Sequence, residues 1–125
     1  MMANLTLDFP SEIETLSKAF QLSVREDTYY PESFGNAILI LSGPGIRIRL
    51  CRDRDQFLLD LAPIGNYRWA SVNEVFESLR IPYQLDPNSP PTGAVQMLVD
   101  RREQVLDYIQ EQKASWPAPR IRPPL

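Results

Sequence analysis

The chain has 125 residues, 43% of them hydrophobic and 23% charged, which is the size and composition of one ordinary globular domain rather than of a disordered chain. Thirteen basic against sixteen acidic side chains give a formal charge of −3, which disfavours nonspecific attraction to nucleic acid. The single Cys51 cannot form an internal disulfide, no apolar run approaches about 20 residues, and the N-terminus lacks a signal-peptide pattern. We therefore expect a cytoplasmic protein without a nucleic-acid or membrane partner.

The first predicted element is a short helix over about residues 11–20. Ser11 with Glu14 forms the pattern of a capping box after Pro10, and apolar residues follow at helical spacing. Leu22 and Val24 then alternate with polar residues, which predicts a strand running into the polar and aromatic segment that follows.

Three further strands are predicted between residues 36 and 62. Ile46, Ile48 and Leu50 alternate with polar neighbours, and turn-forming residues at 42–45 and 52–55 separate this strand from the strands on either side. Pairing apolar residues with apolar residues places Ile48 opposite both Leu39 and Leu59. In the same register Arg47 faces Asp60, and this opposite-charge pair agrees with it.

Two C-terminal helices complete the predicted fold. Ser71 with Glu74 forms a second capping box, which predicts a helix over about 72–80, and Thr92 caps a longer helix that ends near Ala114. We predict an α+β fold, an antiparallel meander sheet of about four strands with an N-terminal helix and two C-terminal helices packed on it. The domain spans 1–115, and 116–125 form a flexible proline-rich tail.

No residue pattern in the chain indicates catalysis. The sequence has no histidine to activate Cys51, whose position in a strand is typical of a small apolar filler. Asp53 and Asp55 lack the spacing of a calcium loop, and Gly43-Pro44-Gly45 is not followed by the helix of a phosphate loop. We therefore predict no enzymatic activity, no metal and no cofactor.

The segment from residue 26 to 34 is the strongest candidate for a protein-binding surface. Tyrosines are enriched at binding hot spots, and flanking carboxylates steer a basic partner. The candidate residues are Glu26, Asp27, Tyr29, Tyr30, Glu32 and Phe34. A simpler interpretation buries one of the tyrosines under a strand connection.

Arginines provide the alternative binding surface, at Arg47, Arg49 and Arg68. A row of arginines on one face of a strand suits an acidic partner. The structural explanation is equally direct, because arginine stems can cover Ile38 and Ile40 while their guanidinium groups stay in water.

The segment Asp27-Thr28-Tyr29-Tyr30-Pro31-Glu32 resembles the acidic, double-tyrosine stretch by which colicin-type immunity proteins grip nuclease toxins, and Ser89-Pro90-Pro91-Thr92-Gly93 is similar to the start of their last helix. That family is all-helical, so the resemblance implies a binding role rather than a fold. It implies a noncatalytic immunity protein that occludes a basic toxin domain. A regulatory or scaffold module of a larger assembly and a small-ligand-binding domain remain alternatives.

Overall fold

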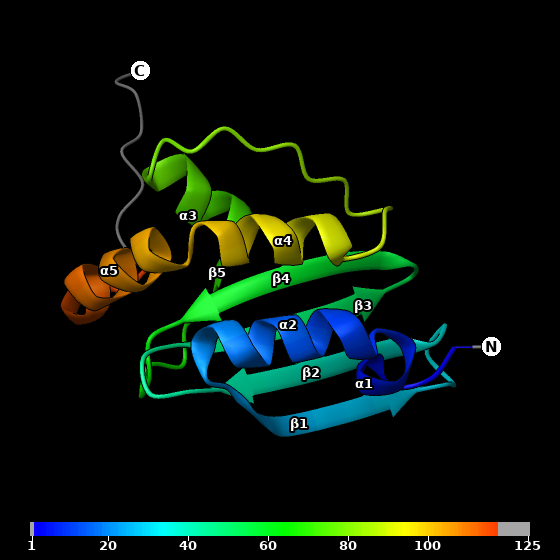
Figure 1. The fold of residues 1–125 in the computed structure, drawn as a ribbon. Coiled ribbons are helices and arrows are strands. Elements are labelled where there is room, and N and C mark those ends of the chain that lie inside the picture. The colour runs from blue at the N-terminus through cyan, green and yellow to red at the C-terminus, as the bar shows by residue number, and fades with distance from the viewer. Residues whose placement is uncertain (1, 118–125) are drawn as a thin grey trace, which may run out of the picture.

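The computed structural model describes residues 2–117, which form a two-layer α+β domain with helices over one face of an antiparallel sheet (Figure 1). The elements in chain order are α1 (Leu5–Asp8), α2 (Pro10–Phe20), β1 (Ser23–Tyr30), β2 (Asn36–Ser42), β3 (Arg47–Asp53), β4 (Gln56–Ala62), β5 (Ala70–Ser71), α3 (Val72–Ser78), α4 (Thr92–Asp100), α5 (Arg102–Gln112) and a 3-10 turn (Lys113–Ser115). The predicted fold class is confirmed.

Within the described residues the sheet is a meander of five strands in the order β1-β2-β3-β4-β5. The fifth strand, which the sequence does not predict, is only two residues long and pairs with Asp60 and Leu61 of β4. Alternate residues of β2 and β3 are buried, so one face of the sheet forms the core under the helices. Figure 1 shows α2 and α4 side by side across this face.

The predicted strand register is wrong by two residues in both central hairpins. Ile48 lies opposite Leu41 and Leu61, and Asp60 lies opposite Arg49 rather than Arg47. The turn between β3 and β4 lies one residue later than predicted, because its central residues are Arg54 and Asp55, both with positive φ (51° and 68°), and Asp53 pairs with Gln56. A shift of two residues keeps every apolar side chain on the core face, so hydrophobic alternation alone cannot detect it.

The helix starts follow the sequence signals only in part. Ser71 caps α3 as predicted, because its hydroxyl accepts a hydrogen bond from the backbone N–H of Glu74 at 3.2 Å. The expected caps at Ser11 and Thr92 are wrong, since α2 begins one residue earlier at Pro10 and α4 begins after Pro91. Proline suits a helix start because its fixed φ is helical and its missing N–H would have no partner there.

The C-terminal part of the domain differs from the prediction in two places. The expected long helix is interrupted at Arg101, where φ is −107° and ψ is 20°, so α4 and α5 are separate helices. The sequence pattern places Trp116 in the tail, but this residue is buried, packs edge-on against Tyr108 and donates its indole N–H to the Arg68 carbonyl at 3.0 Å. The domain therefore includes Trp116, and the predicted flexibility of 118–125 lies outside the described residues.

Among residues 2–117, no helix combines the length and the apolar character that crossing a membrane requires.

Candidate functional site

Strand β1 divides the predicted binding segment between the two faces of the sheet. Successive side chains of a strand point to opposite faces. Asp27 and Tyr29 lie opposite the buried Leu39 and Ala37, on the side of the helices. The structure therefore brings only part of the predicted set together on one accessible surface.

Asp27 and Tyr29 have structural contacts instead of free surface. The Asp27 carboxylate accepts hydrogen bonds from the Asn4 side chain at 3.1 Å and from the Thr6 hydroxyl, which ties α1 to the edge of the sheet. The half-buried Tyr29 ring packs against the core, and the Arg52 guanidinium lies 5.9 Å from its centroid. The simpler interpretation of one buried tyrosine thus applies to Tyr29.

The turn after β1 presents the most exposed aromatic ring of the predicted segment. The Phe34 side chain is 72% exposed, and Tyr30 at the end of β1 is 42% exposed. Phe34 and Gly35 have φ values of +58° and +73° and are the central residues of a turn closed by the Asn36 N–H on the Ser33 carbonyl at 3.0 Å. A left-handed conformation costs a residue such as phenylalanine about 1–2 kcal/mol. The backbone is therefore strained where the ring is held out to solvent.

The β3–β4 turn supports this ring from the side. The backbone N–H of Arg54 donates to the Asn36 side chain at 2.9 Å, and the Arg54 guanidinium lies 5.0 Å from the Phe34 ring centroid. Two turns with positive φ thus meet in one cation–π contact.

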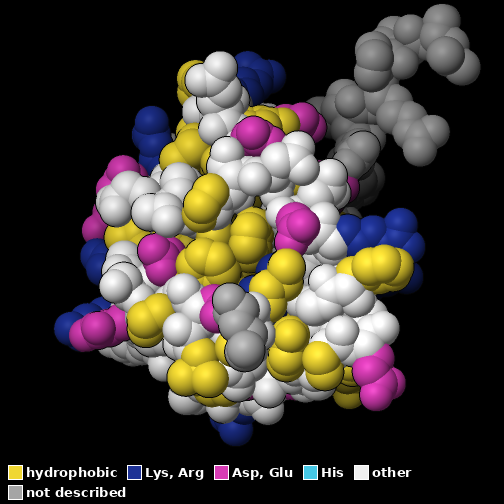
Figure 2. All heavy atoms as spheres, turned by 90° about the vertical axis from the view of Figure 1, so that its right-hand side faces the viewer, with side chains coloured by type: hydrophobic (Ala, Val, Ile, Leu, Met, Phe, Trp, Pro, Cys, Tyr) yellow, Lys and Arg dark blue, Asp and Glu magenta, His cyan; other side chains and the backbone are white. Residues whose placement is uncertain are grey.

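We call the resulting area the turn surface, and it consists of Met2, Tyr30, Glu32, Phe34 and Arg54. A Cβ built at Gly35 would meet the Met2 sulfur, so the Met2 side chain lies directly against this turn. Figure 2 looks at this end of the molecule and shows apolar side chains across its middle, with most basic side chains near the rim. An exposed apolar surface of this kind suits a protein partner.

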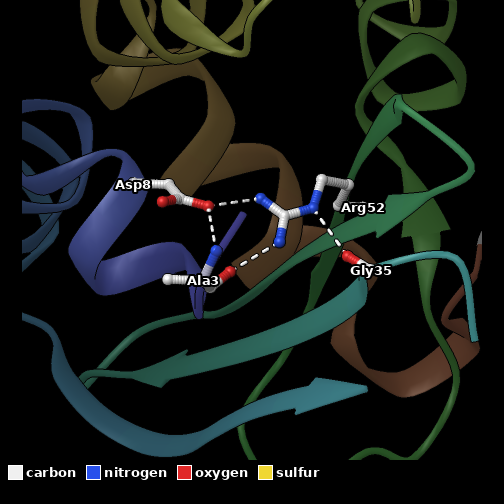
Figure 3. Close-up of polar contacts among 4 residues, drawn as sticks. All are labelled: Ala3, Asp8, Gly35 and Arg52. Carbon is white, nitrogen blue, oxygen red and sulfur yellow. Dashed lines mark hydrogen bonds and ion pairs between the residues drawn. The ribbon is translucent and has the colours of Figure 1, made fainter. Parts of the chain in front are cut away.

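Arg52 supports the turn surface from inside the fold (Figure 3). Only 4% of this side chain is exposed, and its guanidinium donates to the Asp8 carboxylate at 2.7 Å, to the Ala3 carbonyl at 2.5 Å and, through Nε, to the Gly35 carbonyl at 2.9 Å. A buried charge requires such partners. Arg52 therefore fixes both the N-terminal segment and the turn that carries Phe34.

The carboxylate of Asp8 is also stabilised in its charged form. The backbone N–H of Ala3 donates to it at 2.9 Å, and this bond together with the Arg52 guanidinium lowers the pKa of Asp8 against the opposing effect of burial.

Sequence reasoning missed Arg52, although a signal was present. The alternation of Ile48 and Leu50 on the core face continues to position 52, which places Arg52 inward. The prediction of a turn over residues 52–55 places Arg52 outside the strand, and this is why its buried role was missed. The strained backbone at Phe34 left no comparable signal.

The alternative surface at Arg47, Arg49 and Arg68 is built around Trp69. The guanidinium groups of Arg47 and Arg49 lie 4.6 Å and 4.7 Å from the Trp69 ring centroid. Arg49 also pairs with Asp60 at 2.7 Å, and Arg47 donates to the Asn66 carbonyl. The side chain of Arg68 is exposed. Most of this cluster is engaged in contacts within the domain.

Cys51 has the environment of a packing residue. Burial raises the pKa of its thiol, although Arg49 acts in the opposite direction, so the protonated form dominates at neutral pH. Across residues 2–117, no group of three histidine, cysteine, aspartate or glutamate side chains is arranged to hold a metal ion.

Comparison with known proteins finds no match among protein-family models, curated proteins or solved structures.

Proposed function

We propose that this protein acts by binding another protein through the turn surface, without catalysing a reaction. The observation that carries the proposal is Phe34, whose ring is 72% exposed on a backbone with φ of +58°. Strain of this kind persists where surrounding structure maintains it, and it is common at ligand-binding positions. Here Arg54 holds the ring and Arg52 holds the next peptide group.

The charges near the turn surface suggest a basic partner. Glu32 lies within the turn, and the exposed Glu26 lies further along β1. Carboxylates around an aromatic anchor steer a positively charged protein toward it. The most concrete form of the proposal is an immunity protein that blocks a basic toxin domain by occlusion in the cytoplasm. The resemblance of residues 27–32 to colicin-type immunity proteins supports this form, now with Tyr30 and Phe34 as the contacting rings.

The test begins with capture of the native partner from the source cell and its identification. Binding of that partner is then measured for Phe34→Ala and for a matched control, Tyr67→Ala. Tyr67 is 93% exposed and lies outside the turn surface, so the control removes an aromatic ring that is even more accessible than that of Phe34. We expect Phe34→Ala to weaken binding by about 2 kcal/mol and the control to change it little.

The opposite pattern of binding by the two variants would place the binding site outside the turn surface. Loss of binding in Tyr67→Ala, with Phe34→Ala unchanged, would assign binding to the region around Arg68 and Trp69. Equal binding by both variants and the wild type would exclude the turn surface as the site.

A further inference from the structure

A second candidate binding site lies at the opposite side of the sheet from β1, where β4 runs beyond the short β5. The site is a cleft with a volume of about 510 Å³, which is within the range of binding pockets. Its walls come from β4, the start of α3, the loop 84–91 and the start of α4. These segments leave an opening beside the edge of the strand.

The cleft exposes the edge of β4 rather than one of its faces. Four consecutive residues, Phe57 to Asp60, line it, although their side chains alternate between the two faces of the sheet. Strand β5 pairs only with Asp60 and Leu61. Within the described residues, no strand pairs with 57–59 on that side.

The backbone of β4 is directed into this opening. The Phe57 N–H donates to the Pro87 carbonyl in the loop at 2.8 Å, so the backbone groups of Phe57 point away from β3. Residues two apart on an antiparallel strand direct their backbone groups the same way. The N–H and carbonyl of Leu59 therefore face the cleft, in line with β5.

The lining of the cleft is apolar with an acidic margin. Its apolar residues include Leu50, Phe57, Leu59, Val72, Leu85 and Ala94. Within residues 2–117, the charged residues that line it are Asp60 and Asp86, and none of the lining residues is basic. Asp60 already pairs with Arg49, which leaves the exposed Asp86 as the main site for a cation.

We propose that this cleft binds a short extended peptide segment of a partner protein, in which apolar residues alternate with lysine or arginine. The segment adds to the edge of β4 and continues the line of β5. Main-chain hydrogen bonds to Leu59 provide affinity, and pockets for alternate side chains provide selectivity, as in other cases of strand addition. The cationic residue pairs with Asp86. This site is independent of the turn surface and does not rest on its function.

The test uses a synthetic peptide, acetyl-Val-Arg-Val-Arg-Val-amide, titrated into the full ¹⁵N-labelled chain. We expect saturable shifts of the Leu59 and Leu85 amide resonances. Two control peptides separate the contributions. The same peptide with N-methyl groups on alternate residues cannot form the strand bonds, and a version with glutamate in place of arginine reverses the charge. Both should bind at least tenfold more weakly.

A protein variant tests the acidic margin. Asp86→Asn keeps the side-chain oxygen that accepts the Asn88 N–H at 2.9 Å, so the loop retains its turn, while the charge and the oxygen that accepts the Ser89 hydroxyl at 3.2 Å are lost. Affinity for the arginine peptide should fall severalfold and become less dependent on salt. Absence of shifts around the cleft, equal binding of the N-methylated peptide, or equal binding by Asp86→Asn would each overturn the proposal.

Discussion

Arginine packs on an aromatic ring both at the turn surface and at Trp69, and the two places differ in what surrounds the ring. At the turn surface, Arg54 lies over the exposed Phe34 ring, and both residues have positive φ. At Trp69, two arginines lie over one half-buried ring, and Arg49 is paired with Asp60. The same kinds of side chain thus form an accessible, strained surface in one place and a partly buried structural contact in the other. Exposure and strain, rather than residue type, distinguish a candidate site.

The largest effect is expected from removing the arginine beneath the turn surface. Arg52→Met removes the charged partner of the Asp8 carboxylate and the guanidinium donor of two backbone carbonyls, so the free energy of unfolding should fall by about 3 kcal/mol. Arg54→Met, two residues away on the exposed turn, should lower it by less than about 1 kcal/mol. Denaturant unfolding of both variants measures the contrast. Equal losses of unfolding free energy in the two variants would show that the burial of Arg52 does not make it more important for stability than Arg54.

The tryptophan cluster should affect stability and not partner binding. Trp69→Ala removes two cation–π contacts and a half-buried ring, and we expect a loss of about 2 kcal/mol in unfolding free energy. The dissociation constant for the captured partner should stay within about twofold of the wild-type value. If Trp69→Ala impaired partner binding and left stability unchanged, the Trp69 cluster and not the turn surface would be assigned the binding role.

The ion pair of Asp8 predicts a dependence of stability on pH. Because the folded pKa of Asp8 is lowered, its contribution is fully present above its unfolded value of about 3.9 and is lost as pH falls through the folded value. Asp8→Asn should therefore be less stable than the wild type at pH 7, and the two should converge below about pH 4. Unfolding curves between pH 7 and pH 2 measure this. A difference that stays constant over that range would contradict the ion pair.

The smallest expected effect concerns two carboxylates, Glu32 of the turn surface and Glu26 further along β1. Glu26→Gln with Glu32→Gln should slow association with a basic partner by a fewfold and reduce its dependence on salt, with little change in dissociation. Stopped-flow or surface kinetics at two salt concentrations resolve the rates. An effect on dissociation alone would mean that these carboxylates contact the partner directly.

Much of the architecture could be predicted from alternation and turn residues. The buried rows of β2, β3 and β4 follow directly from the sequence because only one face of the sheet is covered. The register could not be predicted this way, because a two-residue shift leaves the same side chains buried. The positive φ values of Arg54 and Asp55, which set the register, are uncommon in residues other than glycine.

The sequence predicts which segment carries the candidate site, but it does not predict which residues of that segment are accessible. The sequence identified the region around Tyr30 and Phe34, but a loop-like interpretation hid the strand that turns Asp27 and Tyr29 inward. Arg52 acts through contacts with Ala3 and Gly35, which lie far from it in the sequence. Contacts of this kind depend on tertiary structure and have no local pattern.

The central claim is that the strain at Phe34 is retained for binding, and Phe34→Asn tests it most directly. Asparagine tolerates positive φ, and Asn-Gly is a favoured pair for a turn whose two central residues are left-handed. We expect the free energy of unfolding of the variant to equal that of the wild type or to exceed it by up to about 1 kcal/mol. Its affinity for the captured partner should fall by about 2 kcal/mol. A variant that loses stability without losing affinity would contradict the account.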